Sequence, residues 1–204
     1  MEPEDTRTIA GCTITEPVAA SWEQHAESKI QERRKLNFGK AALCRDTATV
    51  AAMAHIHEKI DFTVAIFVVH AGRVLLIHHR NLDRWLPLGG HIELDEDPEQ
   101  AALREAREQS GLDVELLGDR PPTTGPGTRA LIAPRFLDIH RITPTHEHIG
   151  MIYWARPKNG ALTLSASEHH DIRWCSAADL DHLEPPMTAA VKWYCRAALR
   201  EVSN

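Results

Sequence analysis

The segment from Gly90 to Leu112 constrains the fold of this chain more than any other part of the sequence. It runs GHIELDEDPEQAALREAREQSGL, and residues with good helix propensity fill it from Pro98 to Ser110. Proline is favoured in the first turn of a helix, and glycine is favoured just past its end, where Gly111 stands. We therefore predict one helix over these thirteen positions.

Three polar side chains of this predicted helix share one face. Glu105, Glu108 and Gln109 stand at positions i, i+3 and i+4, which project to the same side of a helix. Mg²⁺ and Mn²⁺ prefer such oxygen ligands, and Gly89-Gly90 lets the backbone turn and bring carbonyls toward the same cation. The alternative interpretation is an ordinary surface helix, in which Arg104 and Glu108 form an i,i+4 ion pair.

The segment as a whole resembles the Nudix box of the Nudix hydrolase family. The positions that match the family's pattern and register are Gly90, Glu96, Arg104, Glu105, Ala106, Glu108, Gly111 and Leu112. Gln109 departs from the pattern, because the family carries a second consecutive glutamate at that place. The resemblance covers about Asp61 to Ala198 and leaves out residues 1–60.

This resemblance implies a fold and an activity. The fold is α/β (α+β), a Nudix-type α/β/α sandwich with a mixed β-sheet. The activity is divalent-metal-dependent pyrophosphohydrolysis of a nucleoside diphosphate linked to another moiety, such as a nucleotide sugar like ADP-ribose or a (d)NTP, with Mg²⁺ or Mn²⁺ as the cofactor. By position, Glu105 and Glu108 are catalytic metal ligands, Gln109 is a weakened ligand, Gly89 supplies a carbonyl, and Arg104 orients Glu105.

Further candidate site residues lie outside the box. The family often draws one more acidic residue from a later loop, and Glu168 stands six residues before Trp174, which suits metal binding or general-base work on water. A solvated loop carboxylate explains Glu168 equally well. His79, Arg80 and Arg84 precede the box and are candidates for binding substrate phosphates, with a polar strand end and loop as the alternative.

Gln109 leaves two functional hypotheses open. If the remaining carboxylates hold the cation, the chain is an enzyme with weaker metal affinity or a shifted metal preference. If they do not, the domain binds a nucleotide without hydrolysing it and acts as a sensor or regulator.

The rest of the sequence alternates predicted strands and helices. A hairpin is expected from Phe62–Val69 and Arg73–Ile77, because both arms are β-branched and apolar around a His-Ala-Gly turn. Further strands are expected at Val114–Leu117, Arg135–Arg141, Gly150–Ala155 and Asp171–Cys175, and helices at Ser21–Leu36, Thr47–Ile60 and from Pro186 to about Val202.

We expect two parts, a helical extension over residues 1–60 and a hydrolase domain over 61–204. The first helix carries a narrow apolar stripe of Trp22, Ala26 and Ile30, which an isolated helix of this length cannot bury alone. We therefore favour a homodimer that buries this stripe. A monomer whose extension folds back is the alternative.

The amino-acid composition limits the kinds of partner that we expect for this chain. Among 204 residues, 23 Lys and Arg stand against 29 Asp and Glu, a net charge of −6, which argues against a nucleic-acid partner. No apolar run approaches the ~20 residues of a membrane span, and the acidic N-terminus is unlike a signal peptide. Four scattered cysteines are typical of reduced thiols. The sequence predicts a cytoplasmic protein with a small-molecule substrate.

The chain contains 13 histidines, which invite a transition-metal interpretation. The pairs His55/His57 and His146/His148 could each chelate a metal, but spacing marks no third ligand. Neither pair completes an HExxH motif, which excludes a zincin-type site. We therefore interpret these histidines as structural.

Overall fold

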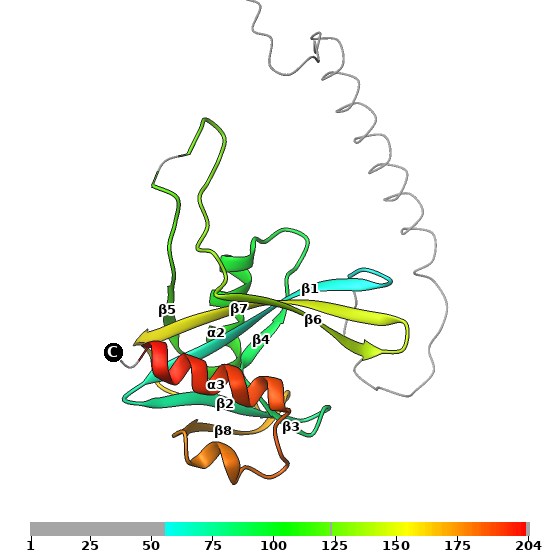
Figure 1. Cartoon of the computed structure of the whole chain (residues 1–204), viewed down its shortest axis with the longest axis vertical. Coiled ribbons are helices and arrows are strands. Elements are labelled where there is room, and N and C mark those ends of the chain that lie inside the picture. The colour runs from blue at the N-terminus through cyan, green and yellow to red at the C-terminus, as the bar shows by residue number, and fades with distance from the viewer. Residues whose placement is uncertain (1–55, 123, 203–204) are drawn as a thin grey trace, which may run out of the picture. The chain divides into compact units, whose positions relative to one another are not determined.

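The computed structural model describes residues 56–122 and 124–202, and Figure 1 shows their arrangement. Along the chain the elements are β1 (Ile60–His70), β2 (Arg73–His79), β3 (Arg84–Leu86), β4 (Leu88–His91), α2 (Pro98–Ser110), β5 (Asp113–Leu117), β6 (Phe136–Thr143), β7 (His146–Asn159), β8 (His169–Cys175), the 3₁₀ turn η1 (Asp179–Asp181) and α3 (Ala189–Val202). This order of interleaved strands and helices confirms the α+β fold class.

The strands form a mixed sheet, as expected. Strand β1 pairs parallel with β7 over residues 60–68 and antiparallel with β4, while β5 and β6 flank β7. At its far end β1 passes through the predicted hairpin into β2, which pairs in turn with β3 and β8. Ala71 and Gly72 make this turn, both with positive φ, which is the geometry of a tight β-hairpin.

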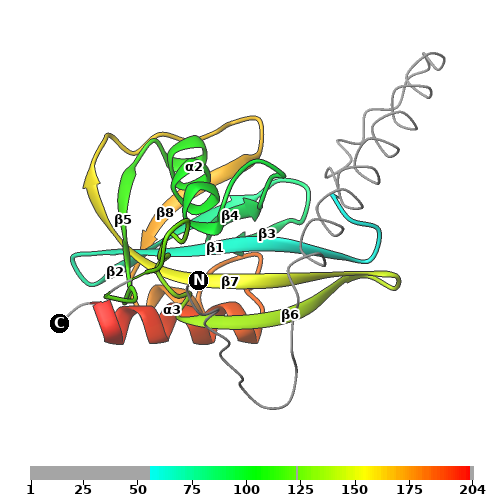
Figure 2. The same ribbon diagram turned by 90° about the horizontal axis from the view of Figure 1, so that it is seen from above.

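The two helices cover opposite faces of the central strands, which Figure 2 shows from above. One core cluster joins Phe67 and Trp154 of the sheet to Cys195 and Ala198 of α3. The other joins alternate residues of β1, such as Ile66, to the alanines of α2. Because side chains of a strand alternate between faces, β1 contributes to both cores, and an α/β/α sandwich results.

Two sequence expectations differ from the structure. The predicted helix Thr47–Ile60 is wrong at its C-terminal end, because residues 56–59 are bends and Ile60 begins β1. The Glu147 amide donates to the Lys59 carbonyl at 2.9 Å, so pairing with β7 overrides local helix propensity. The structure also contains β3 and β4 between the predicted hairpin and the predicted helix, where the sequence patterns predicted no strand.

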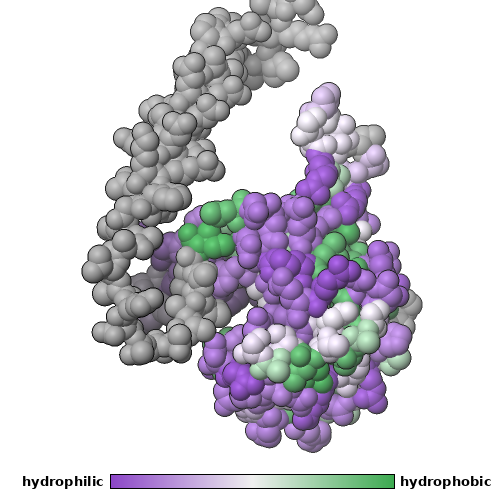
Figure 3. Space-filling view, turned by 180° about the vertical axis from the view of Figure 1, so that it is seen from behind, coloured by the Kyte–Doolittle hydropathy of each residue, from purple (hydrophilic) through white to green (hydrophobic). Residues whose placement is uncertain are grey.

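The predicted helix at Ser21–Leu36, with the apolar stripe through which we expect dimerisation, lies outside the described residues. Within the described part, neither helix is long and apolar enough to span a membrane. Figure 3 shows one face of the molecule as mostly hydrophilic, with hydrophobic residues in separate patches. Burial of apolar side chains is therefore concentrated in the two cores that hold the helices on the sheet.

Candidate functional site

Helix α2 is held at both ends, which fixes the direction of its polar face. The Asp97 side chain accepts hydrogen bonds from the Glu99 and Gln100 amides, and the Gln100 side chain accepts from the Asp97 amide, forming a capping box. At the other end Gly111 adopts a left-handed conformation with φ of 72°, and its amide donates to the Arg107 carbonyl. The helix bounds therefore match the prediction.

The two glycines of β4 let this strand run directly beneath the helix. A Cβ on Gly90 would collide with the Glu105 carboxylate, and Gly89 has a φ of +150° with its missing Cβ directed at the Val64 carbonyl. Ala101 and Ala106 are fully buried on the inner side of α2. Small residues on both elements thus allow the close approach that buries Glu105 to 9% exposure.

Arg104 gathers the carboxylates of the box around one cation. Its guanidinium donates to both oxygens of Glu96 at 2.6 and 3.0 Å, to Glu105 at 2.8 Å and to Glu108 at 3.0 Å. It also donates to the His91 carbonyl of β4 at 3.1 Å. These bonds hold the pKa of Glu96 below its usual range and raise that of Arg104. Arg104 therefore contacts Glu105 directly, and its role in orienting a metal ligand stays a prediction.

Gln109 lies between two of the predicted metal ligands. Its amide nitrogen donates to the Glu105 carboxylate at 2.9 Å and to the Gly89 carbonyl at 2.8 Å, while its oxygen accepts from the Gly89 amide at 3.0 Å. The Gly89 N–H needs an acceptor, so this orientation of the amide is the consistent one. In this arrangement Gln109 donates hydrogen bonds to Glu105 and to the Gly89 carbonyl, the two predicted metal ligands beside it. Its own contact with a metal ion stays a prediction.

The negative charge of Glu105 is only partly compensated by its hydrogen bond to Arg104. Burial raises its pKa, and the neighbouring carboxylates of Glu108 and Glu168 raise it further, while Arg104 opposes them. The site thus places Glu168, which is remote in sequence, within electrostatic range of the box. A divalent cation would relieve this excess of negative charge.

The loop before β8 presents Glu168 to solvent, with its side chain 56% exposed. Arg80 holds this loop: its backbone amide donates to the Glu168 carbonyl at 2.9 Å and its guanidinium donates to the Ala166 carbonyl at 2.9 Å. Arg80 thus positions the backbone of the loop that carries Glu168. The predicted substrate contacts of Arg80 stay a prediction.

The other two candidates for substrate binding lie on the adjacent edge. His79 at the end of β2 pairs with Arg84 at the start of β3. The His79 Nδ1 atom accepts from the Leu82 amide at 3.2 Å, and its ring lies 5.7 Å from that of buried His169. Arg84 is exposed. Substrate binding by these residues remains a prediction.

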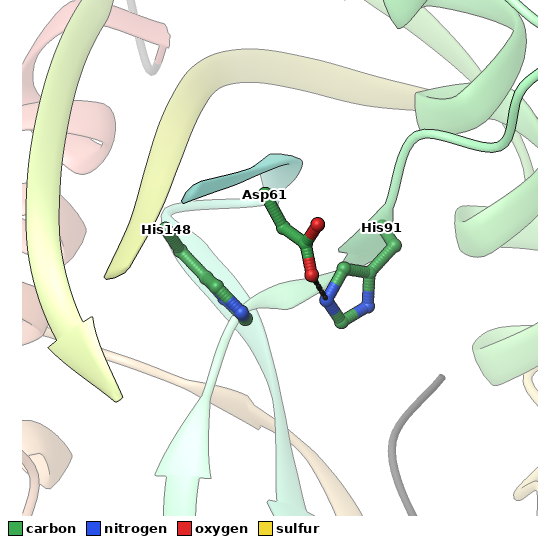
Figure 4. A group of neighbouring side chains, drawn as sticks. All are labelled: Asp61, His91 and His148. Atoms are coloured by element: carbon green, nitrogen blue, oxygen red, sulfur yellow. Dashed lines mark ion pairs between the residues drawn. The ribbon is translucent and has the colours of Figure 1, made fainter. Parts of the chain in front are cut away.

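Sequence reasoning missed a cluster of histidines around a buried carboxylate. Asp61 of β1, His91 of β4 and His148 of β7 bring ligand-type atoms within 4.8 Å of one another (Figure 4). His146 lies beside them, with its Nε2 atom 3.2 Å from Asp61. Burial and the neighbouring imidazoles lower the pKa of His148 to about 4. The His-x-His spacing of β7 was the only signal of this cluster in the sequence.

The sequence and the fold were compared with those of known proteins. A family model described as the NUDIX domain matches residues 59–201. The chain is similar to the crystal structure of a NUDIX-family hydrolase from Clostridium perfringens, with 30% sequence identity and a TM-score of 0.61, over 70% of this chain and 97% of that chain. No match was found among curated protein sequences.

Two further structures are similar at lower identity. A MutT NUDIX hydrolase from Burkholderia pseudomallei is 24% identical with a TM-score of 0.51, over 71% of this chain and 99% of that chain. A MutT protein from Methanosarcina mazei Go1 is 18% identical with a TM-score of 0.53, over 74% of this chain and 100% of that chain. At these identities the likeness supports the fold alone.

Proposed function

The chain belongs to the NUDIX family of hydrolases, and from this premise we propose that it is a divalent-metal-dependent pyrophosphohydrolase. Its substrate would be a nucleoside diphosphate linked to another moiety, such as a nucleotide sugar like ADP-ribose or a (d)NTP. The observation that carries the proposal is the buried Glu105 carboxylate. It lies against Gly90, is oriented by Arg104 and is surrounded by the further carboxylates of Glu108 and Glu168.

The residues at the box fit Mg²⁺ or Mn²⁺. Glu105, Glu108 and the Gly89 carbonyl offer hard oxygen donors, and the negative charge around Glu105 is only partly balanced by Arg104. Glu168 would complete the set from its loop. When bound, the cation would polarise a phosphoryl oxygen and help to activate the attacking water.

Within this proposal each side chain has a separate task. Arg104 holds Glu105 and Glu108 in one orientation through its rigid guanidinium. Glu168 is exposed to solvent and can accept a proton from water at a carboxylate oxygen, so it is our candidate for the general base. Arg80 positions the loop that carries it.

Gln109 supports the alternative function, a nucleotide-binding sensor with weak or no turnover. Its amide nitrogen donates to Glu105 and to the Gly89 carbonyl, so two metal ligands are already engaged by a neutral donor. Each bond uses one lone pair of an oxygen that a cation would also contact, and Gln109 adds no negative charge to the site. The missing charge is the specific reason to keep the second hypothesis.

A substrate panel separates the two functions. Nucleotide sugars, dinucleotides and (d)NTPs are incubated with the full chain in Mg²⁺ and in Mn²⁺, and released phosphate or nucleotide is measured. Turnover that is lost in Glu105→Gln and retained in Glu115→Gln, an exposed carboxylate of β5, supports the enzyme. A ligand that raises Tm without being consumed supports the sensor.

The homodimer and the cytoplasmic location belong to the same proposal as expectations. Light scattering of the full chain and of a chain that begins near Ile60 measures the contribution of the preceding residues to assembly. A monomeric full-length protein at micromolar concentration contradicts the dimer.

A further inference from the structure

Four side chains of the types that bind metal ions, three histidines and one aspartate, lie on one face of the adjacent strands β4, β1 and β7. Asp61 pairs with His148 across β1 and β7, and Thr63 pairs with His91 across β1 and β4. Residues two apart in a strand share a face, so Asp61, His91, His148 and His146 project to the same side. Figure 4 shows the side chains of Asp61, His91 and His148 converging.

Two distances from Asp61 in this histidine–aspartate cluster equal those between neighbouring ligands of a tetrahedral metal site. The Asp61 Oδ2 atom lies 3.3 Å from His91 Nε2 and 3.2 Å from His146 Nε2. In a tetrahedral zinc site with bonds of about 2.0–2.1 Å, neighbouring ligand atoms are about 3.3–3.4 Å apart. The ligand atoms of Asp61, His91 and His148 lie within 4.8 Å of one another, and His146 joins this group through its contact with Asp61.

The outer contacts of the cluster are those that orient metal ligands. The Asp61 Oδ1 atom accepts a hydrogen bond from the His57 amide at 2.6 Å, which turns Oδ2 toward the imidazoles. The His146 Nδ1 atom bonds the Glu58 carbonyl at 3.3 Å, and because a carbonyl only accepts, Nδ1 carries the proton. Metal-bound histidines characteristically donate their other nitrogen to such an acceptor.

This tautomer leaves His146 in the form that binds a metal. In neutral His146 the Nε2 atom then carries a lone pair, and it lies 3.2 Å from the carboxylate oxygen Oδ2 of Asp61. Asp61 is completely inaccessible to solvent, and a buried carboxylate is stabilised by nearby positive charge. A divalent cation at this point would interact favourably with both side chains.

We propose that Asp61, His91, His146 and His148 form a binding site for a borderline divalent cation of the Zn²⁺ type, separate from the carboxylates of the box. Three imidazoles with one carboxylate are a donor set that favours zinc, whereas Mg²⁺ favours oxygen ligands. The site uses neither Arg104 nor any carboxylate of the box, and His91 is the one side chain of the box segment that it includes, so it does not depend on the proposed hydrolase activity.

The position of the site indicates a structural role that reaches the box through β4. The site ties β1, β4 and β7 together at one end of the sheet. His91 directly follows Gly90, which lies against Glu105, and the His91 carbonyl accepts from Arg104. A metal on the His91 side chain would therefore stabilise the strand that supports the box.

Cobalt provides a spectroscopic test on the full chain, prepared without a histidine tag. Co²⁺ is titrated in excess Mg²⁺ into the wild type and into Glu105→Gln, and visible absorption is recorded. We expect the intense bands of tetrahedral Co²⁺ in both proteins, saturating at one ion per chain. Asp61→Asn and His148→Gln should weaken binding by more than the about 10–100-fold that changes in outer contacts cause.

Two further variants protect the test against simple misfolding. His70→Gln removes an exposed histidine at the far end of β1, and we expect it to bind Co²⁺ like the wild type. His91→Cys keeps a metal ligand and should add a thiolate-to-cobalt charge-transfer band in the near ultraviolet. Absence of tetrahedral bands in the wild type, or unchanged bands in His148→Gln, would overturn the proposal.

Discussion

The box carboxylates and the histidine–aspartate cluster neutralise negative charge in opposite ways. At the box, Arg104 holds the carboxylates of Glu96, Glu105 and Glu108 through hydrogen bonds of 2.6 to 3.0 Å. In the cluster a single buried carboxylate, Asp61, is faced by imidazoles. The first arrangement combines a permanent cation with oxygen donors, of which Glu108 is exposed, and this suits a hard metal and an exchangeable substrate. The second is buried and nitrogen-rich, which suits a resident metal.

The two sites meet at β4 and are separated by one peptide unit. Gly90 lies against the Glu105 carboxylate on the α2 side, and the next side chain, His91, projects to the opposite face of the strand. Strand β4 can therefore support an oxygen-rich site on one face and a nitrogen-rich site on the other, because successive residues of a strand point to opposite faces. This difference also predicts that damage to one site affects activity and damage to the other affects stability.

The largest expected effect is on turnover, at Glu105. Glu105→Gln removes the buried charge around which the box is organised while preserving shape. Metal stabilisation of a phosphoryl transition state is worth several kcal/mol, so kcat should fall by about two to four orders of magnitude. Steady-state rates with saturating Mg²⁺ measure the loss, and Glu115→Gln in β5 is the matched control. Wild-type rates in Glu105→Gln would remove Glu105 from the site.

The second effect is on stability, at Asp61. Asp61→Ala leaves the imidazoles without their buried carboxylate and removes the acceptor of the His57 amide. Leaving a buried donor without its acceptor costs about 1–3 kcal/mol. Urea unfolding in the presence of EDTA measures this cost without metal, and Asp83→Asn, an exposed partner of His78, should change stability by less than about 1 kcal/mol. Equal losses in both variants would mean that the buried carboxylate of Asp61 stabilises the fold no more than an exposed one does.

The third effect tests how far Arg104 organises the box. Arg104→Lys keeps the charge but cannot bond Glu96 at two points while also reaching Glu105, because an ammonium lacks the planar fork. We expect kcat to fall by about 10–100-fold, as for other residues that orient metal ligands. Arg107→Lys, in the same helix but exposed beside Asp113, is the control. If the two lysine variants behave alike, orientation by Arg104 does not limit the rate.

The polar face at the C-terminal half of the box could be predicted from sequence because its residues belong to one helix. The spacing of Glu105, Glu108 and Gln109 places them on one face whatever the remainder of the fold does, and Pro98 and Gly111 mark the helix ends. The bonds that Gln109 makes to Gly89 depend on how closely β4 approaches the helix. Sequence spacing carries no information about that approach.

The histidine–aspartate cluster could not be predicted because its residues come from three strands. The register that pairs Asp61 with His148 and Thr63 with His91 is set by tertiary packing. The sequence placed the seventh strand from Gly150 onward, whereas β7 begins at His146. The pair His146 and His148 was visible as a possible chelate but could not be assigned to one face of a strand, and its partners 50 or more positions earlier were not marked by any motif.

The smallest expected effect is at Gln109. It tests whether one more carboxylate strengthens the binding of hard cations at the box and leaves the histidine–aspartate cluster unchanged. Gln109→Glu restores the carboxylate usual in the family and removes the amide that donates to Glu105 and to the Gly89 carbonyl. Without metal the new carboxylate lies beside Glu105 and repels it. A bound cation relieves this repulsion and gains one negative ligand. We expect Mg²⁺ and Mn²⁺ to bind the variant several-fold more tightly and the Co²⁺ bands of the cluster to stay unchanged.

Calorimetric titration with Mn²⁺ measures this change in the wild type and in Gln109→Glu. The control is Gln100→Glu, which alters an exposed glutamine of the same helix. An unchanged Mn²⁺ affinity in Gln109→Glu would mean that position 109 only braces Gly89 and does not reach the ion.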